Sequence, residues 1–328
     1  MKKALILNNI GTPASPRTAD VKVYLDEFLM DPDVIGLPFP LRWLLVKGLI
    51  TPRRSPQSAA KYRAIWTPEG SPLAVHTERF ADKLREILGP DWIVRVGMRY
   101  GEPSLFRVLR ELRESSVETL VFAPLFPQFA QATSGSAIKT VKNELEKMSW
   151  SPELRILPAF HDREEFLRPQ AELIRPHLAK ADHVLFSFHG LPESQIREAH
   201  GGVDEKCDAG HPCRANCYKT QSLTTAKDLA RLLELPEGRW SASFQSRLGP
   251  AKWIGPSTDD TIKVLAAGGV KNLVVACPSF VADCLETLEE IGLGGKEDFL
   301  HAGGREFTLV PCVNEDDAWA RGFVKLIQ

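Results

Sequence analysis

The clearest fold signal in the sequence is the stretch Leu185-Phe186-Ser187-Phe188-His189-Gly190-Leu191-Pro192, an apolar run that ends at a histidine, a glycine and a proline. Runs of this kind, bounded by turn residues, indicate strands that are buried on both faces of a parallel sheet. A similar stretch, Leu5-Ile6-Leu7-Asn8-Asn9-Ile10-Gly11-Thr12-Pro13, lies near the N-terminus. The two stretches predict one strand of the same kind in each half of the chain.

Two further pairs of stretches match in the same order. Arg99-Tyr100-Gly101-Glu102-Pro103-Ser104 matches Gly255-Pro256-Ser257 after Arg247, and Leu120-Val121-Phe122-Ala123-Pro124-Leu125-Phe126 matches Val274-Val275-Ala276-Cys277-Pro278-Ser279-Phe280. Duplication of one unit explains the shared order, although chance similarity of strand ends is the alternative. We predict an α/β fold of two similar, doubly wound, Rossmann-like domains with parallel sheets, residues 1–180 and 181–328.

Short apolar runs alternate with amphipathic segments along the chain, as in βα units. The expected strands are residues 4–7, 93–97, 119–123, 183–187, 242–245 and 273–276. The expected helices are residues 77–88, 103–114, 139–147, 164–178, 220–233 and 258–267.

Composition limits the classes of function. Of the 328 residues, 43% are hydrophobic and 25% charged, which is typical of globular proteins. The formal net charge of −1 provides no positive field for nucleic acid. The first apolar run stops at Asn8 and Asn9, too early for a signal peptide, and no run approaches the ~20 residues that cross a bilayer. We expect a cytoplasmic protein with no spanning segment and no nucleic-acid partner.

Candidate catalytic residues stand at two predicted strand ends. His189 follows a buried strand, at the edge where open α/β sheets bind their ligands. Asp283, Glu286 and Glu290 have helical spacing after the Cys277 turn, which predicts three carboxylates on one helical face. A histidine and a carboxylate from two strand ends can form an acid–base or metal pair. A structural histidine and a solvated acidic face are the alternatives.

Several motifs together resemble the ferrochelatase family. Residues 185–192 and 283–290 are similar to its two active-site motifs. Further similarities, in family order, are Asn9-Ile10-Gly11-Thr12-Pro13, Gly70-Ser71-Pro72-Leu73, Arg99-Tyr100, Pro124-Leu125-Phe126-Pro127-Gln128, Gln245-Ser246-Arg247-Leu248-Gly249-Pro250 and Trp253-Ile254-Gly255-Pro256. The resemblance implies a chelatase-like fold and an enzyme of heme biosynthesis that inserts ferrous iron into protoporphyrin IX, releasing two protons.

The resemblance also implies roles for individual residues. His189 and Glu286 would be catalytic and would meet the metal, and Asp283 and Glu290 would continue an acidic lane for cations or protons. A neutral histidine is able to accept a pyrrole proton at working pH. Substrate-binding positions would be Ile10, Arg99, Tyr100, Phe126, Gln245, Arg247 and Trp253. The apolar ones would line a flat porphyrin slot, or belong to the plain core, and the arginines would suit a propionate.

The segment 37–50 is strongly apolar, contains prolines, and is followed by Arg53 and Arg54. The family resemblance implies a hydrophobic lip over the porphyrin slot that touches the membrane surface peripherally. Such a lip favours protoporphyrin IX over coproporphyrin III, which carries more carboxylates. A coproporphyrin III ferrochelatase, a cobalt or nickel chelatase, and a non-catalytic heme or porphyrin carrier are the alternative functions.

A cysteine-rich segment runs Cys207-Asp208-Ala209-Gly210-His211-Pro212-Cys213-Arg214-Ala215-Asn216-Cys217. In a reduced compartment three thiols so close together indicate metal ligands rather than disulfides. Similar family members imply a 2Fe-2S cluster on Cys207, Cys213 and Cys217, whose fourth ligand would be Cys277, Cys284 or Cys312. Zinc held with His211, or three unliganded cysteines, are the alternatives. Cys284 replaces a second histidine of other members.

Overall fold

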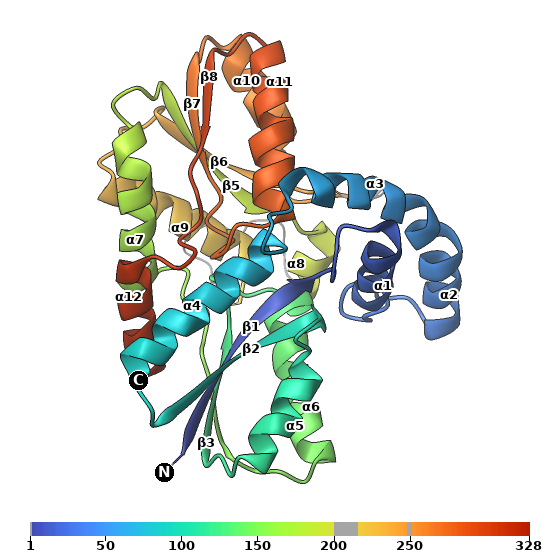
Figure 1. Cartoon of the computed structure of the whole chain (residues 1–328). Coiled ribbons are helices and arrows are strands. Elements are labelled where there is room, and N and C mark those ends of the chain that lie inside the picture. The colour runs from blue at the N-terminus through green and yellow to red at the C-terminus, as the bar shows by residue number, and fades with distance from the viewer. Residues whose placement is uncertain (1, 200–215, 248–250) are drawn as a thin grey trace. The chain divides into compact units, whose positions relative to one another are not determined.

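Two parallel sheets organise the computed structural model, which describes residues 2–199, 216–247 and 251–328 (Figure 1). The chain divides into two compact units. Unit 1 contains Met1–Leu125, Gln131–Pro158 and Val324–Gln328, and unit 2 contains Phe126–Ala130 and Ala159–Phe323. The two units are described one at a time below.

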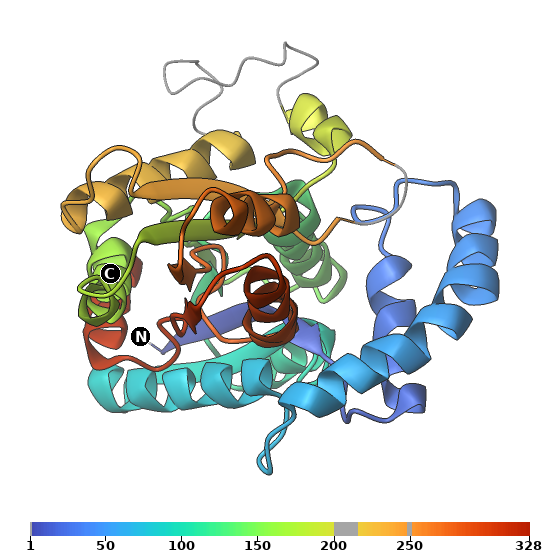
Figure 2. The same ribbon diagram turned by 90° about the horizontal axis from the view of Figure 1, so that it is seen from above.

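Unit 1 contains a four-stranded parallel sheet with the order β2-β1-β3-β4. Its strands are β1 (Lys3–Thr12), β2 (Trp92–Gly101), β3 (Thr119–Pro124) and β4 (Glu153–Ile156). The helices associated with it are α1 (Thr18–Leu29), α2 (Phe39–Trp43), the π-helix η1 (Leu44–Ile50), α3 (Thr51–Ile65), α4 (Pro72–Leu88), α5 (Leu105–Glu114), the π-helix η2 (Gln131–Gly135) and α6 (Ser136–Lys147). Figures 1 and 2 both show α1, α2 and α3, in blue, together at one side of this unit.

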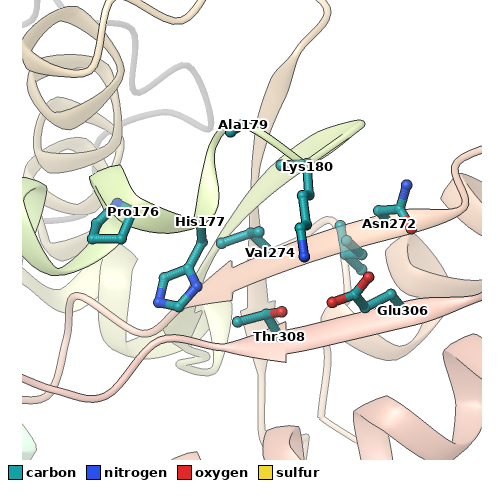
Figure 3. A pocket seen from close by; sticks show the side chains of 10 residues that line it. Pro176, His177, Ala179, Lys180, Asn272, Val274, Glu306 and Thr308 are labelled. Atoms are coloured by element: carbon teal, nitrogen blue, oxygen red, sulfur yellow. The ribbon is translucent and has the colours of Figure 1, made fainter.

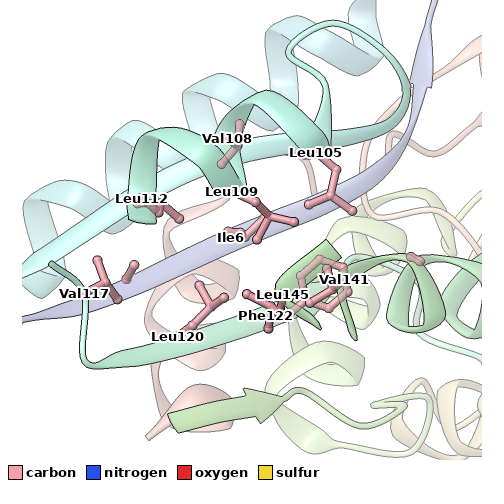
Figure 4. Close-up of a cluster of buried hydrophobic side chains, with 12 residues drawn as sticks. Ile6, Leu105, Val108, Leu109, Leu112, Val117, Leu120, Phe122, Val141 and Leu145 are labelled. Carbon is pink, nitrogen blue, oxygen red and sulfur yellow. The ribbon is translucent and has the colours of Figure 1, made fainter. Parts of the chain in front are cut away.

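The core of unit 1 lies where α5 and α6 cover β1 and β3 (Figure 4). Leu105, Leu109 and Leu112 follow helical spacing along α5, so they share one face and meet Ile6 and Phe122 of the sheet. All five side chains are at most 2% exposed. Burial of such side chains contributes roughly 1.5–3 kcal/mol each, which fixes these two helices on the sheet.

A glycine allows β1 and β2 to approach each other beyond Asn9. Gly11 has φ +106°, and a Cβ built on it would lie 1.7 Å from the carbonyl oxygen of Tyr100. No larger residue fits this backbone position without moving β2. The pairing Gly11↔Tyr100 therefore depends on the missing side chain and sets the place of Ile10 and Tyr100 at the strand ends.

Unit 2 contains a second four-stranded parallel sheet, with the order β6-β5-β7-β8. Its strands are β5 (His183–His189), β6 (Trp240–Gln245), β7 (Asn272–Ala276) and β8 (Glu306–Leu309). The helices of this part of the chain are α7 (Glu164–Ile174), the short 3-10 helix η3 (Arg175–His177), α8 (Glu193–Ala199), α9 (Tyr218–Leu232), α10 (Thr258–Ala267), the π-helix η5 (Glu286–Gly295) and α11 (Lys296–His301). The last helix, α12, runs Asp317–Ile327.

The two sheets have the same strand order, which confirms the predicted α/β fold with two doubly wound parallel sheets. The match around Pro103 and Pro256 extends to backbone bonds: Met98 N donates to the Pro103 carbonyl at 2.7 Å, and Phe244 N donates to the Pro256 carbonyl at 2.8 Å. The next serines, Ser104 and Ser257, each cap a helix. A division of the chain between residues 180 and 181 stays a prediction.

The six predicted strands are present, whereas β4 and β8 were not expected from the sequence. Both are four-residue strands at a sheet edge, and β4 alternates exposed and half-buried residues. A short edge strand lacks the continuous apolar run of a central parallel strand, so its signal is weak. No helix in the described ranges combines the length and the apolar character needed to cross a bilayer.

Candidate active site

His189 is the last residue of β5, the central strand that pairs with both β6 and β7. Its half-buried ring makes an edge contact with Phe280, with ring centroids 6.3 Å apart. Nδ1 lies 2.6 Å from the carbonyl oxygen of Gly190. Because that oxygen only accepts hydrogen bonds, Nδ1 carries the proton of the neutral ring, and Nε2 is left as the base.

The surroundings of His189 favour the neutral ring. Burial lowers its pKa below the ordinary value, while the nearby carboxylate of Glu286 and the Gly190 carbonyl act in the opposite direction. The net shift is downward, so the ring is unprotonated at neutral pH. Nε2 is therefore available to accept a proton.

The acidic segment forms a π-helix rather than the predicted α-helix. Helix η5 begins at Glu286 and includes Glu290, but Asp283 precedes it. The prediction of one helical face for all three carboxylates is therefore wrong for Asp283. A π-helix is rare and often marks a functional site. Glu286 and Glu290 remain about one turn apart.

Asp283 is anchored by several hydrogen-bond donors. Its carboxylate accepts bonds from Asn314 Nδ2 at 2.7 Å, from Thr287 Oγ1 at 3.1 Å and from the backbone N–H of Cys312 at 3.3 Å. The Asn314 side chain in turn accepts from the Asp283 N–H at 2.8 Å. Buried at 5% exposure, Asp283 fixes the start of the acidic segment to the loop after β8.

Glu290 is bound by the residue that follows β6. Ser246 donates its N–H and its hydroxyl to the two carboxylate oxygens of Glu290, at 2.7 and 2.6 Å. Burial is the main cause that raises the pKa of Glu290 to about 7. This carboxyl therefore exchanges a proton in the same pH range as a histidine.

Gln245 connects three elements of unit 2. Its amide oxygen accepts from Ser187 Oγ of β5 at 2.7 Å and from the thiol of Cys277 at 3.9 Å. Its Nε2 donates to the carbonyl of Glu286 at 2.8 Å. Because the side chain is only 1% exposed and both its amide oxygen and its amide nitrogen are hydrogen-bonded, Gln245 supports the backbone of Glu286.

Gly190 permits close packing next to His189. A Cβ on this residue would lie 2.6 Å from the Gln245 carbonyl oxygen and 3.3 Å from the ring of Trp253. Trp253 is held there by a bridge to Pro192, and the next residue, Ile254, donates its N–H to Leu191 at 3.0 Å. The predicted residue Trp253 thus lies beside the turn that carries His189.

Two residues that the sequence analysis did not single out also contact His189. Ser279 Oγ accepts the N–H of His189 at 3.3 Å, and the hydroxyl of Tyr218 donates to its carbonyl at 2.8 Å. Ser279 belongs to the repeated strand-end motif, which was the available signal for it. Tyr218 lies 29 positions along the chain and had no such signal.

Two predicted substrate-binding residues of unit 1 share one buried carboxylate. Arg99 forms an ion pair with Asp31, which also accepts from Tyr100 at 2.7 Å and from Ser136 at 2.9 Å. Hydrogen bonding and the Arg99 charge outweigh the desolvation of Asp31 and lower its pKa. Burial raises the pKa of Tyr100, whose side chain is 1% exposed. Both residues are therefore internally paired.

The remaining predicted substrate-binding residues are more accessible. Ile10, near the end of β1, and Phe126, which follows β3, are half-buried. Arg247 is half-exposed and lies 3.9 Å from Asp260. Their roles toward a porphyrin stay predictions.

The cysteines contribute one described residue of the predicted cluster. Cys207 and Cys213 lie outside the described residues, whereas Cys217 is buried and its sulfur accepts the N–H of Thr220 at 3.4 Å. In the described ranges no group of three His, Cys, Asp or Glu side chains has a geometry that could hold a metal ion.

The three cysteines considered as a fourth ligand are buried. Burial, together with nearby carboxylates, raises the pKa of Cys277, Cys284 and Cys312 well above the ordinary value. Cluster ligands are thiolates. Because a bound metal ion itself favours the thiolate form of its cysteine ligands, the role of these three residues stays a prediction.

A pocket of about 200 Å³ lies at the opposite end of the unit 2 sheet (Figure 3). It is lined by His177, Lys180, Asn272, Glu306 and neighbouring residues, which precede or begin the strands. His189 stands at the carboxyl end of β5, where α/β sheets carry their ligands. This pocket is therefore separate from the candidate active site.

Solved structures share the fold of the chain. The sirohydrochlorin chelatase SirB from Bacillus subtilis subspecies spizizenii, in complex with cobalt, matches with a TM-score of 0.52 and 8% identity over 100% of this chain and 94% of that one. SirB from Bacillus subtilis with Fe3+ matches with a TM-score of 0.54 and 10% identity over the same shares. These likenesses establish the fold alone.

Curated relatives cover nearly the whole chain. Ferrochelatase from Bdellovibrio bacteriovorus is 48% identical over 100% of this chain and 99% of its own length. Ferrochelatase from Azotobacter vinelandii is 47% identical over 98% and 97%, respectively. The family model described as Ferrochelatase matches residues 2–328. The chain therefore belongs to the ferrochelatase family, the metal chelatases that insert ferrous iron into a porphyrin in heme biosynthesis.

Proposed function

We propose that this enzyme uses protoporphyrin IX as its porphyrin and that His189 accepts the pyrrole protons, with Glu286 as its partner. The observation that carries the proposal is the 2.6 Å contact between Nδ1 of His189 and the Gly190 carbonyl, which leaves Nε2 as the base, and the Glu286 charge acts on the same ring. Hydrogen bonds hold both residues in place. Gln245 donates to the carbonyl of Glu286, and Ser279 and Tyr218 bind the backbone of His189.

The proposed chemistry is a proton–metal exchange on the porphyrin ring. Two N–H bonds break, two iron–nitrogen bonds form to the resulting anions, and ordinary dative bonds form to the other two nitrogens. Nε2 of His189 takes each proton in turn, which creates an imidazolium that the Glu286 carboxylate stabilises. The proton then leaves, so that the ring is neutral again before the second transfer.

Glu290 and Asp283 have different parts in this proposal. Glu290, with a pKa of about 7, is suited to pass protons away from Glu286. Asp283 belongs to the proposed acidic lane with Glu286 and Glu290. Its carboxylate also holds the start of this segment in place. The more accessible predicted residues, Ile10, Phe126, Arg247 and Trp253, are proposed as porphyrin contacts. Arg99, Tyr100 and Gln245, which bind other residues of their own unit, are proposed as supports of the residues around them.

The choice of protoporphyrin IX rests on an apolar exposed surface. Within the segment 37–50, which we call the lip, Phe39, Leu41 and Leu44 are 62%, 58% and 63% exposed. Arg53 and Arg54 are exposed directly after it. Aromatic and aliphatic side chains beside cations suit the interface of an anionic membrane. We infer a cytoplasmic enzyme that contacts the membrane peripherally and receives a poorly soluble porphyrin there.

The test is an anaerobic assay with ferrous iron and either protoporphyrin IX or coproporphyrin III, followed by absorption. His189→Gln is compared with His183→Gln, because both residues lie on β5 and His183 stands at the other end of the strand. We expect loss of activity of about a hundredfold or more only in His189→Gln. Faster turnover of coproporphyrin III would contradict the substrate, and an active His189→Gln would contradict the role of the histidine.

The cysteine segment is proposed as a 2Fe-2S site in which Cys207, Cys213 and Cys217 would be ligands, separate from the metallation chemistry. Its fourth ligand is proposed to come from Cys277, Cys284 or Cys312, which are all buried cysteines. Anaerobically purified protein should contain two irons and absorb visible light before substrate is added. Stoichiometric zinc without iron would support the alternative that includes His211.

A further inference from the structure

At His189, strand β5 is still paired with β6 but no longer with β7. The last pair between β5 and β7 is Phe186↔Ala276, whereas pairing with β6 continues to His189↔Gln245. Successive residues of a strand direct their backbone groups to opposite neighbours, and Gly190 N donates to β6 at the Gln245 carbonyl, 2.8 Å away. The N–H and C=O of His189 therefore point to the edge of β5 where pairing with β7 has stopped.

Two hydroxyl groups occupy the place of the missing strand. Tyr218 donates to the His189 carbonyl at 2.8 Å, and Ser279 accepts the His189 N–H at 3.3 Å. The hydroxyls of Tyr218 and Ser279 are 3.0 Å apart. Since Tyr218 has a single proton, which it gives to His189, the proton between the two hydroxyls must come from Ser279.

The three residues thus form a closed ring of hydrogen bonds in one direction. His189 N–H donates to Ser279, Ser279 donates to Tyr218, and Tyr218 donates to the His189 carbonyl. Each hydroxyl donates once and accepts once within the ring. Chains of this kind strengthen one another, so loss of one member weakens the others.

Tyr218 is well suited to remain a donor. Its side chain is 6% exposed, and its hydroxyl lies 2.8 Å from the His189 carbonyl oxygen, which only accepts hydrogen bonds. It is the first residue of α9, directly after Cys217, whose sulfur caps that helix. The hydroxyl is therefore fixed by the N-terminal end of α9, while Ser279 is fixed by the turn after β7.

We propose that Tyr218 and Ser279 are positioning residues for metallation: their hydroxyls hold the backbone of His189 so that its Nε2 faces the substrate. This inference rests on the proposed role of His189. Neither residue needs to contact the porphyrin or the iron. Because the hydrogen bonds form one ring, we expect the loss of either hydroxyl to lower turnover and the two losses to be coupled.

The experiment compares Tyr218→Phe, Ser279→Ala and the double variant in full-length protein. We expect kcat to fall between about tenfold and a hundredfold in each single variant, with the KM for porphyrin within about twofold of the wild type. The double variant should lose less than the product of the two single losses.

Thr225→Val is the matched control, because it removes another buried α9 hydroxyl, which bonds His161 and Gln128 rather than His189. It should leave kcat and the KM for porphyrin unchanged. If Tyr218→Phe and Ser279→Ala lower only the thermal midpoint, the hydroxyls are merely structural and the inference is overturned. An inactive His189→Gln beside a fully active Tyr218→Phe overturns the inference alone, whereas a fully active His189→Gln overturns the proposed function as well.

Discussion

Three acidic side chains close together in the sequence have three different environments. Asp283 is fixed by Asn314, Thr287 and the Cys312 N–H, whereas Glu290 is bound by Ser246. The charge of Glu286 acts to raise the pKa of His189, against the larger effect of burial. At the scale of single residues, the partners of each carboxylate, rather than its spacing, separate a structural anchor from a group that exchanges protons.

The raised pKa of Glu290 makes a testable contribution to stability. A carboxyl whose pKa rises from 4.5 to about 7 on folding stabilises the protein fully below pH 4.5, and this contribution is lost as pH rises through 7. The loss is on the order of 3 kcal/mol. Glu290→Gln keeps acceptor and polar groups for Ser246 without a charge, so its stability should fall less over this range.

The measurement is the free energy of unfolding in denaturant at pH 5 and pH 8. The free energy of unfolding should fall from pH 5 to pH 8 by less in Glu290→Gln than in the wild type. The control Glu114→Gln changes an exposed carboxylate on α5 and should follow the wild type at both values. Identical pH dependence of Glu290→Gln and the wild type would contradict the assignment of the raised pKa.

At the scale of elements, close approaches between backbones place the strand ends. In unit 1, β1 passes the carbonyl of Tyr100 at Gly11, and in unit 2 the turn after β5 passes the carbonyl of Gln245 at Gly190. Both glycines belong to the first matched pair of sequence stretches. The repeated motif therefore encodes a backbone contact as well as a strand.

Gly11→Ala should be much more damaging than an alanine at a glycine with free space. A Cβ at Gly11 would lie 1.7 Å from a carbonyl oxygen, so we expect a loss of about 3 kcal/mol or more. Gly89, the residue after α4, also has positive φ, at +73°, but nothing lies within 4 Å of its Cβ position. Gly89→Ala should cost only about 1–2 kcal/mol, from backbone strain alone.

Thermal and denaturant unfolding of the two glycine variants separates the steric effect from strain. Because both positions have positive φ, backbone strain is common to the pair and the close contact is not. If Gly11→Ala proves as stable as Gly89→Ala, β1 and β2 do not approach each other as described.

At the scale of the whole molecule, one sheet topology occurs twice with different additions. Each unit has a four-stranded parallel sheet of equivalent order. Unit 1 adds α1, α2, η1 and α3 between its first two strands in sequence, and α2 and η1 form most of the lip. Unit 2 adds the ten-residue π-helix η5 and the acidic residues at its start. A repeated sheet thus supports a proposed membrane-contact surface and a proposed catalytic pair.

Membrane contact through the lip predicts vesicle binding that depends on its apolar side chains. Phe39→Ser with Leu44→Ser should reduce co-sedimentation with phosphatidylcholine–phosphatidylglycerol vesicles severalfold, because each large side chain contributes roughly 1.5–3 kcal/mol when buried in lipid. Val264→Ser is the control, since Val264 is 69% exposed on α10 outside the lip. Equal binding of the wild type, the lip variant and the control would contradict the proposed contact.

The sequence by itself determined the features that depend on local pattern. Apolar runs ending in glycine and proline predicted the central strands, since a strand buried on both faces must be continuously apolar. The matched motifs predicted the repeated topology, and the stretch around His189 placed that residue at a strand end. The edge strands β4 and β8 escaped prediction because partial exposure removes that pattern.

Only the tertiary structure decided which polar groups meet. Spacing placed Asp283 with Glu286 and Glu290, but the segment forms a π-helix that starts after Asp283, and Asn314 binds that carboxylate. Tyr218 reaches His189 from 29 residues away, and Asp31 reaches Arg99 from 68. Hydrogen bonds between distant segments depend on how helices pack on the sheets, which no local pattern records.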